Sequence, residues 1–358
     1  MTKYAATGLL VLALALGSCG KTASDQQGEL APASEELMKL AREQFKPLPA
    51  SAKDIPGFTA SAELVELGAM LYHDPRLSGS HALSCASCHN IGLGGGDDAS
   101  TSVGHNFQQG GRNAPTVLNA TFNFAQFWDG RAKDLFEQAG GPIVNPIEMN
   151  SPKAHITEQL KSIPGYADAF AKAYPGDKDP ITLEHVQQAI AAFETTLITP
   201  NAPFDQYLNG KADALDANQK AGFKLFLDTG CASCHNGMNV GGGMYAKFGM
   251  ASDPDPKYRP PADQGRFKIT NDKADLYSFK VPTLRNVALT APYFHTGSVW
   301  DLKEAVKVMA KAQLGKDLND ADADKIVAFL GSLTGEQPNV RVPILPASGP
   351  NTTRPVRN

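Results

Sequence analysis

Two copies of a cofactor-attachment motif dominate the chemistry that this sequence could perform. They are Cys85-Ala-Ser-Cys88-His89 and Cys231-Ala-Ser-Cys234-His235. In a Cys-x-x-Cys-His motif each thiol can add to one vinyl group of haem, and the His then lies beneath the iron as its proximal ligand. A zinc site or a redox disulfide would also use cysteine pairs, but neither explains a His after both pairs. The sequence therefore predicts two covalently attached c-type haems.

The ligand on the opposite face of each haem decides whether that haem only transfers electrons or also binds a substrate. His105 is the candidate for the first haem, because it lies sixteen residues after His89 in a Gly-rich loop that can fold back over the other face. For the second haem a Met would favour electron transfer, and spacing alone leaves four candidates open. They are Met238, Met244, Met250 and Met309.

The segments that must position these residues have mostly helical periodicity, and long loops rich in Gly, Pro and Asn separate them. No alternating β pattern is long enough for a substantial sheet, so we expect a mainly α fold. Helices are predicted at Ala132–Gln138, Ile156–Ser162, Tyr166–Ala173, Leu183–Ile198, Ala217–Phe226, Leu302–Ala312 and Ala321–Leu333.

An internal repeat divides the chain into two units. Gly68–Asp74 precedes the first haem motif and the similar segment Gly222–Asp228 precedes the second, so each unit supplies a helix, a turn and a motif. A boundary is expected near Pro200, because prolines interrupt the preceding helix there. We therefore expect an N-terminal haem domain over 46–199, a C-terminal haem domain over 200–337 and a Pro-rich tail over 338–358.

The N-terminus has the features of an export signal. Lys3 is followed by the apolar run Leu9–Leu16, which is too short to span a membrane. Leu16-Gly-Ser-Cys19 resembles the lipobox of bacterial lipoproteins, and Cys19 is the one cysteine left over from the haem motifs. We expect a signal peptide over 1–18, then a lipidated Cys19, tether and first helix over 19–45; an ordinary cleavage after a small residue is the alternative. The protein would then lie in the periplasm, anchored to a membrane only through this lipid.

The charge of the chain argues against a nucleic-acid partner. The formal net charge is −4, and Lys and Arg are scattered rather than clustered. Haem propionates would make the protein with its cofactors somewhat more acidic than this count.

Several further blocks, taken in order, resemble the bacterial di-haem cytochrome c peroxidase family, a group related to the enzymes that mature a tryptophan-derived quinone cofactor. The resemblance covers about residues 55–335. It implies two cytochrome c-like domains, each with one covalently bound haem, joined by long loops. The blocks are Phe127–Arg131, Pro146–Met149, Ala192–Glu194, Val281–Asn286 and Ala291–Gly297.

The resemblance implies roles for individual residues. His105 matches the distal ligand of the first, low-potential haem, and Met309 matches the axial ligand of the second, high-potential haem. Trp128 matches the tryptophan between the two haems that aids electron passage, and Glu148 the acid–base carboxylate over the peroxide site. A structural calcium ion between the domains is also implied. Its oxygen ligands would come from Asn113 and from the carbonyl groups of Thr290 and Pro292.

The activity implied by the resemblance is reduction of hydrogen peroxide to water, with electrons from a small periplasmic cytochrome c or a blue-copper protein. Met309 favours this branch, because the quinone-maturing enzymes have Tyr in that role. The family also implies a homodimer. Two alternatives stay open at this point: a di-haem electron-transfer cytochrome without catalysis, and a di-haem oxidase of an organic or protein substrate.

Overall fold

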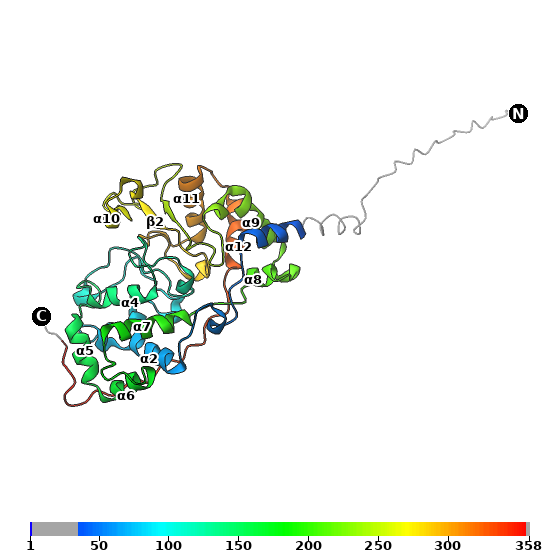
Figure 1. Ribbon diagram of the computed structural model, residues 1–358. Helices are drawn as coiled ribbons and strands as arrows, with labels where there is room; N and C mark the ends of the chain where they lie inside the picture. Colours follow the sequence, from blue (N-terminus) through cyan, green and yellow to red (C-terminus); the bar gives the residue numbers. More distant parts are fainter. Residues whose placement is uncertain (2–34, 356–358) are drawn as a thin grey trace.

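The computed structural model describes residue 1 and residues 35–355 of the 358-residue chain. Apart from Met1, the predicted signal peptide, the lipidation candidate Cys19 and the tether lie outside the described residues. The described chain forms two mainly helical lobes that lie next to each other (Figure 1). The mainly α fold expected from the sequence is therefore confirmed.

The N-terminal lobe is built on two helices that cross at very close range, α2 (Ala62–His73) and α7 (Leu183–Thr195). At the crossing, a Cβ atom on Gly68 would lie 1.9 Å from the carbonyl oxygen of Ala189. Any side chain at position 68 would collide with the backbone of α7, so glycine is required there. This contact sets the distance between the two helices that carry the lobe.

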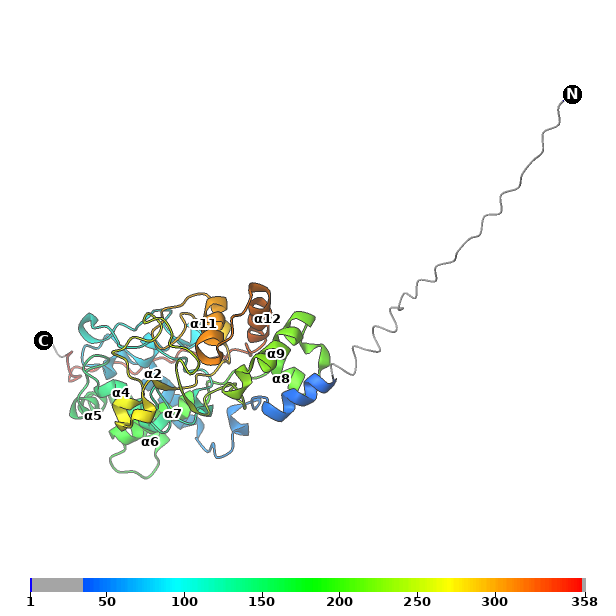
Figure 2. The same cartoon turned by 90° about the horizontal axis from the view of Figure 1, so that it is seen from above.

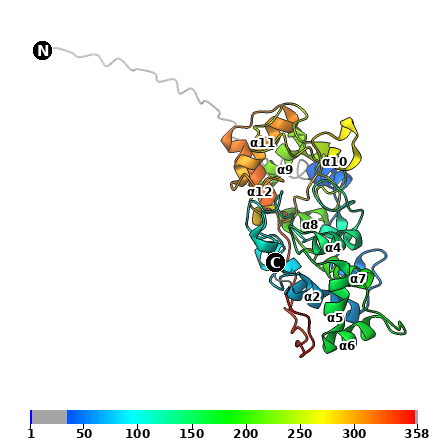
Figure 3. The ribbon, with the colours of Figure 1, turned by 90° about the vertical axis from the view of Figure 1, so that its left-hand side faces the viewer.

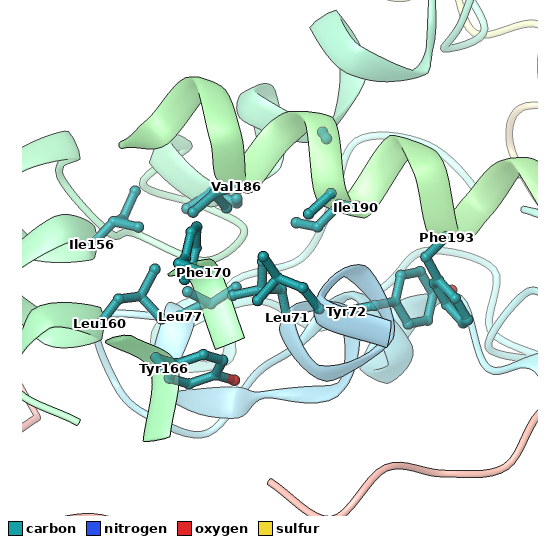
Figure 4. Packing of buried hydrophobic residues seen from close by; sticks show 14 of the residues in the cluster. Leu71, Tyr72, Leu77, Ile156, Leu160, Tyr166, Phe170, Val186, Ile190 and Phe193 are labelled. Carbon is teal, nitrogen blue, oxygen red and sulfur yellow. The ribbon is translucent and has the colours of Figure 1, made fainter. Parts of the chain in front are cut away.

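One apolar cluster fills the space between these helices and three shorter ones, α4 (Leu135–Val144), α5 (Lys153–Lys161) and α6 (Pro164–Ala173). Figure 4 shows residues of this cluster, and at its right-hand end lie Tyr72 and Phe193, whose rings meet edge to face with centroids 5.1 Å apart. These side chains are fully or almost fully buried, which places the main stabilising force of the lobe between α2 and α7.

The C-terminal lobe repeats this plan with α9 (Ala217–Thr229), α12 (Asp320–Gly331) and α11 (Leu302–Leu314). A Cβ atom on Gly222 would lie 1.8 Å from the carbonyl oxygen of Lys325, so the crossing of α9 and α12 has the same glycine as the crossing of α2 and α7. The predicted repeat is therefore present in the packing of the helices.

Two further segments complete the C-terminal lobe, the short helix α8 (Pro203–Leu208) and the helix over residues 35–44. Phe45, at the end of the N-terminal helix, packs against Phe204 and Phe223 with ring centroids 5.4 and 5.8 Å apart. Figure 2 shows this helix beside α8 and α9. The start of the described chain thus packs on the C-terminal lobe before the chain enters the N-terminal lobe.

Short polar side chains fix where the long helices begin. Each of these residues precedes the helix and accepts a hydrogen bond from a backbone N–H of its first turn, which satisfies a donor that the helix itself leaves free. They are Ser61 before α2, Asp134 before α4, Thr182 before α7, Asp216 before α9, Asp301 before α11 and Asn319 before α12.

Regular β structure in the described residues is limited to one antiparallel pair, β1 (Tyr245–Lys247) and β2 (Ser278–Lys280). The connection between the strands contains the short helix α10 (Phe267–Thr270). Within residues 35–355, no helix combines the length and the apolar character that crossing a membrane would require.

The Pro-rich tail leaves the C-terminal lobe and extends along the N-terminal lobe without regular structure (Figures 1 and 3). Val340 packs against the apolar cluster of that lobe. Farther along, the Ser348 hydroxyl accepts a hydrogen bond from Arg76 (2.9 Å), and Thr352 donates to the carbonyl of Ser162 (3.3 Å). The tail therefore connects the end of one lobe to the far side of the other.

Candidate functional site

The second haem motif lies in a cavity between the lobes. Cys231, Cys234 and His235 line it together with Met309 and Trp128. Both thiols are free of disulfide bonds, so they are available for attachment to haem. The other three candidate Met residues, Met238, Met244 and Met250, are not among the lining residues. The structure thus brings Met309, and not its rivals, to the predicted haem site.

The surroundings of His235 suit a metal ligand. Its Nδ1 lies 3.4 Å from the carbonyl oxygen of Val240, an arrangement that leaves Nε2 for the iron. Burial lowers the pKa of His235 to about 4, against the opposing effect of the carbonyl groups of Val240 and Pro282, so the imidazole is neutral at pH 7. The Pro282 carbonyl can lie close to the backbone at position 241 only because this residue is glycine. A Cβ atom on Gly241 would lie 2.1 Å from the Pro282 oxygen.

The lining of this cavity also fits the rest of a haem group. Most lining side chains are apolar, and Lys280 adds one buried amine. Burial lowers the pKa of Lys280 to about 8, because the charged form has little water around it. A haem has an apolar macrocycle and two carboxylates, so an apolar cavity with a buried lysine offers matching chemistry.

The first haem motif forms the short helix α3 (Cys85–Cys88) and its C-cap His89, and α3 packs against α2. The Tyr72 hydroxyl, from α2, donates a hydrogen bond to the carbonyl of His89 (2.6 Å) and fixes the end of the motif. Burial lowers the pKa of the His89 imidazole, and the carbonyls of Gly95 and Pro115 oppose this shift. The neutral imidazole is the form that binds iron. Free Cys85 and Cys88 thiols complete the attachment set.

Glu148 is the acid–base candidate for the first site. Burial, then the charge of Glu194, raise the pKa of the Cys85 thiol, and the charge of Glu148 adds to this rise and to that of Cys88. Burial raises the pKa of Glu148 itself, while the charge of Arg131 and a hydrogen bond from Asn145 (2.9 Å) oppose the rise. A carboxyl group with a raised pKa is suited to exchange protons near neutral pH.

The loop that carries His105 is attached directly to the Glu148 segment. The backbone N–H of His105 donates to the carbonyls of Ile147 (3.0 Å) and Glu148 (2.8 Å), and the His105 side chain is buried. The next two residues, Asn106 and Phe107, have φ of 52° and 61°. Asn tolerates this left-handed region, whereas it is unfavourable for a bulky residue such as Phe107. Phe107 is also 89% exposed. The predicted distal ligand therefore begins a strained, solvent-facing turn.

Trp128 lies at the boundary between the lobes, opposite His295. The two rings meet edge to face with centroids 6.1 Å apart. The backbone on each side of the boundary also donates a hydrogen bond to the other side. Asn113 N–H donates to the carbonyl of His295 (2.8 Å), and Lys280 N–H donates to the carbonyl of Trp128 (2.7 Å). The indole N–H of Trp128 also donates to the carbonyl of Asn113 (2.9 Å).

The two rings occupy equivalent places in the repeated units. Each follows a phenylalanine with positive φ, 68° at Phe127 and 69° at Phe294. Each also lies in a turn closed by an isolated β-bridge, Gln126 with Ala132 and Tyr293 with Val299. The interface thus joins two copies of the same turn, and Trp128 and His295 are its matching aromatic residues.

An ion-pair network that the sequence analysis missed flanks this interface. Arg112 donates to Asp129 (2.7 Å) and forms a two-pronged bridge to Asp263 of the C-terminal lobe (both 2.7 Å). Asp263 in turn lies 3.8 Å from Nε2 of His295. The position of Arg112 beside Asn113 was the only available signal, because its partners are far away in sequence.

The three residues predicted to bind calcium lie along one large cavity. Asn113, Thr290 and Pro292 all line the cavity between the lobes. Their donors would be neutral amide and carbonyl oxygens, which calcium accepts. Among the described residues, no group of three or more His, Cys, Asp or Glu side chains converges on a metal position.

Comparison with known proteins finds a family match in each half of the chain. Residues 62–213 match the family model described as di-haem cytochrome c peroxidase, and residues 219–334 match that of cytochrome c. The chain is 53% identical over 322 residues to the cytochrome c551 peroxidase of Pseudomonas aeruginosa, with 90% of this chain and 93% of that protein covered.

More distant relatives extend the comparison. The chain is 33% identical over 353 residues to the methylamine utilization protein MauG of Methylorubrum extorquens, covering 94% of this chain and 98% of that one. The crystal structure of a MauG-like protein associated with microbial copper homeostasis is similar, with a TM-score of 0.69 and 28% identity over 81% of this chain and 93% of that one.

Proposed function

The chain belongs to the di-haem cytochrome c peroxidase family and carries two haem c groups, and from this premise we propose that it reduces hydrogen peroxide at the first haem site. The electrons would come from a small periplasmic cytochrome c or blue-copper protein and enter at the second site. Two electrons and two protons convert one hydrogen peroxide into two water molecules. The haem iron supplies the electron exchange and the position where peroxide binds.

The observation that carries this proposal is the hydrogen-bonded junction between His105 and Glu148. The ligand candidate and the acid–base candidate share one junction of the backbone. Movement of the His105 turn would open the site and at the same time release the backbone carbonyl groups of Ile147 and Glu148 from their hydrogen bonds with His105. The left-handed backbone of Phe107 stores strain that favours such a movement.

The chain's own residues have separate tasks in the proposed reaction. The Glu148 carboxylate would accept the proton of the peroxide oxygen nearer the iron and return it to the departing oxygen. Trp128, held by its indole hydrogen bond to Asn113, would lie on the route of electrons between the lobes. A calcium ion on Asn113, Thr290 and Pro292 would fix both lobes around Trp128.

The proposal extends to location and assembly. Lipidation of Cys19 would anchor the protein to a membrane on the periplasmic side, and a homodimer is expected from the family resemblance. Mass spectrometry of the mature N-terminus and light scattering of the calcium-loaded protein test these two expectations separately.

The decisive experiment is a visible spectrum of the calcium-loaded protein after one-electron reduction by ascorbate, followed by addition of peroxide. The peroxidase proposal predicts that one haem is reduced, that the other becomes high-spin, and that peroxide is then consumed. If both haems stay low-spin and peroxide persists, the chain is an electron carrier and the proposal is wrong.

A further inference from the structure

Five buried polar atoms of the N-terminal lobe have no hydrogen-bond partner, and they lie in the turn at His81 and on or just before α5. Buried polar atoms are almost always hydrogen bonded, so a group of exceptions indicates a missing water, ion or ligand. None of them belongs to the proposed peroxidase machinery. They are Nε2 of His81, Oγ of Ser151, Nε2 of His155, and Nε2 and Oε1 of Gln159.

The two histidines come from segments that the backbone fastens together. His81 lies in a turn closed by its own N–H to the carbonyl of Ser78 (3.0 Å). The same turn is attached to the chain ahead of α5, because Gly79 N–H donates to the carbonyl of Met149 (2.9 Å). His155 lies in the first turn of α5, and Gln159 follows one helical turn later on the same face.

The two imidazole rings lie close to each other. Their centroids are 6.1 Å apart and their planes are tilted by 31°. A metal ion bound about 2 Å from an Nε2 atom lies about 3 Å from the centroid of that ring, so two rings at this separation can share an ion when both Nε2 atoms face it. Burial, then the neighbouring His155, lower the pKa of His81, and the nearby charges of Asp74 and Arg76 act in opposite directions. Neutral imidazole is the form that binds metal ions.

We propose that His81 and His155 bind a divalent transition-metal ion, such as Zn²⁺, through their Nε2 atoms. Imidazole nitrogen is a preferred ligand of zinc and of its neighbours in the first transition row. No third His, Cys, Asp or Glu joins them in the part of the chain that the structure describes. Water and the unpartnered oxygens of Ser151 and Gln159 would complete the shell, which gives moderate rather than structural-zinc affinity.

The proposed metal site lies between two segments that adjoin the first haem motif and Glu148. His81 lies four residues before Cys85, and α5 begins shortly after Glu148. A bound ion would join the segment leading into the first haem motif to the helix that follows the acid–base candidate. The site is independent of the proposed peroxidase activity, because it uses none of the same side chains.

The test uses the mature, untagged protein with both haems, saturated with calcium, and titrates it with Zn²⁺ in a calorimeter. We expect one zinc ion per chain with a dissociation constant of about 1–10 µM. His81→Gln and His155→Gln should each weaken binding at least about tenfold, since even residues that only orient a ligand contribute that much. His185→Gln is the matched control, because His185 already bonds the carbonyl of Pro180 and stacks on Tyr174.

Two outcomes would overturn the proposal: wild-type protein that takes up no zinc at about 100 µM, or glutamine variants that bind as tightly as wild type. The first outcome would mean that water fills the site. X-ray absorption at the zinc edge of the wild-type complex gives a readout that does not depend on variants. It should show two imidazole ligands, and a zinc ion with one or none contradicts the assignment. Unchanged visible spectra of the variants confirm that both haems remain in place.

Discussion

At the scale of single residues, Glu148 is the most direct test of the proposed chemistry. Glu148→Gln keeps the shape of the side chain and its hydrogen bond with Asn145 but removes the group that accepts a proton. We expect peroxide turnover to fall about a hundred- to ten-thousand-fold, the usual range for loss of a general acid–base group. Steady-state peroxide consumption measures this effect. Unchanged visible spectra with unchanged turnover would show that Glu148 is not the acid–base residue.

The pH dependence of turnover depends on the charges around Glu148. Burial raises its pKa, so the carboxylate is lost, and turnover falls, at a higher pH than for an exposed glutamate. Arg131 opposes this rise, so Arg131→Gln should raise the pKa further and move the acid limb of kcat/KM for peroxide to higher pH. Lys133→Gln removes an exposed neighbouring charge and serves as the control. An acid limb that moves to lower pH in Arg131→Gln would contradict this account.

Residues whose chemistry is local could be predicted from sequence, and residues that work through distant partners could not. Both haem motifs are complete within five positions, because both thiols and the proximal His must reach one macrocycle. Arg112 gives no such pattern, because its partner Asp263 is 151 residues away. His81 and His155 were missed for the same reason.

At the scale of elements, most helices lie close to their predicted positions, and the exception has a physical cause. A helix was predicted over Ala132–Gln138, whereas α4 spans Leu135–Val144. Asp134 caps the helix and moves its start. The helix then continues through Gly-Gly-Pro142, since Ile143 is fully buried in the apolar cluster. Packing here outweighs the local tendency of glycine and proline to end a helix.

The crossing glycines give a prediction at the same scale. Alanine at a helical glycine normally stabilises by about 1 kcal/mol. At Gly68 and Gly222 the added Cβ would lie within 2 Å of a backbone oxygen of the facing helix, so the helices must separate. We expect Gly68→Ala and Gly222→Ala each to destabilise by about 1–3 kcal/mol, measured by denaturant unfolding of the haem-loaded protein.

Gly331, the last residue of α12, provides the matched control. A Cβ there meets nothing within 4 Å, so Gly331→Ala should leave stability unchanged or slightly higher. Equal losses in all three variants would show that the close crossings do not determine the stability of the lobes.

At the scale of the whole molecule, Arg112 is expected to hold the two lobes together. Arg112→Gln leaves Asp129 and Asp263 facing each other without their shared cation. Loss of one partner from a largely buried ion pair costs about 3–5 kcal/mol, and Arg131, which also bonds Asp129, should reduce this cost. We also expect slower electron transfer between the haems, because Trp128 and His295 lose the adjoining support. Flash-induced transfer rates and unfolding curves measure the two effects.

The pH dependence of stability distinguishes the electrostatic contribution of the Arg112–Asp263 ion pair from the packing contribution of the Arg112 side chain. Burial alone would raise the pKa of Asp263, but the hydrogen bonds and charge of Arg112 outweigh it and hold the pKa below its ordinary value. The bridge therefore stabilises the protein above the ordinary pKa of about 3.9 and is lost as pH falls through the lowered value. Wild type and Arg112→Gln should converge in stability below pH 4. A constant difference at all pH values would assign the effect to packing.

The repeat of the lobes could be predicted from sequence, but the way the tail joins them could not. Gly68–Asp74 and Gly222–Asp228 are recognisable as repeats because both lead into a haem motif. The tail has no periodic pattern, and its contacts with Arg76 and Ser162 depend on the arrangement of both lobes. The conformation of such an extended segment is determined by its contacts with the surface along which it lies.

The tail therefore makes a prediction that only the whole molecule can test. A Cβ atom on Gly165, in the first turn of α6, would lie 2.7 Å from Cβ of Pro346. In the full chain, Gly165→Ala must displace the tail and should lower the unfolding temperature. In a chain that ends at residue 337 the same change meets no tail, so the helical preference for alanine should raise stability by up to about 1 kcal/mol. This reversal of sign, measured as a double-mutant cycle, isolates the coupling between tail and lobe. If Gly165→Ala has the same effect in both chains, the tail does not bear on α6 in solution.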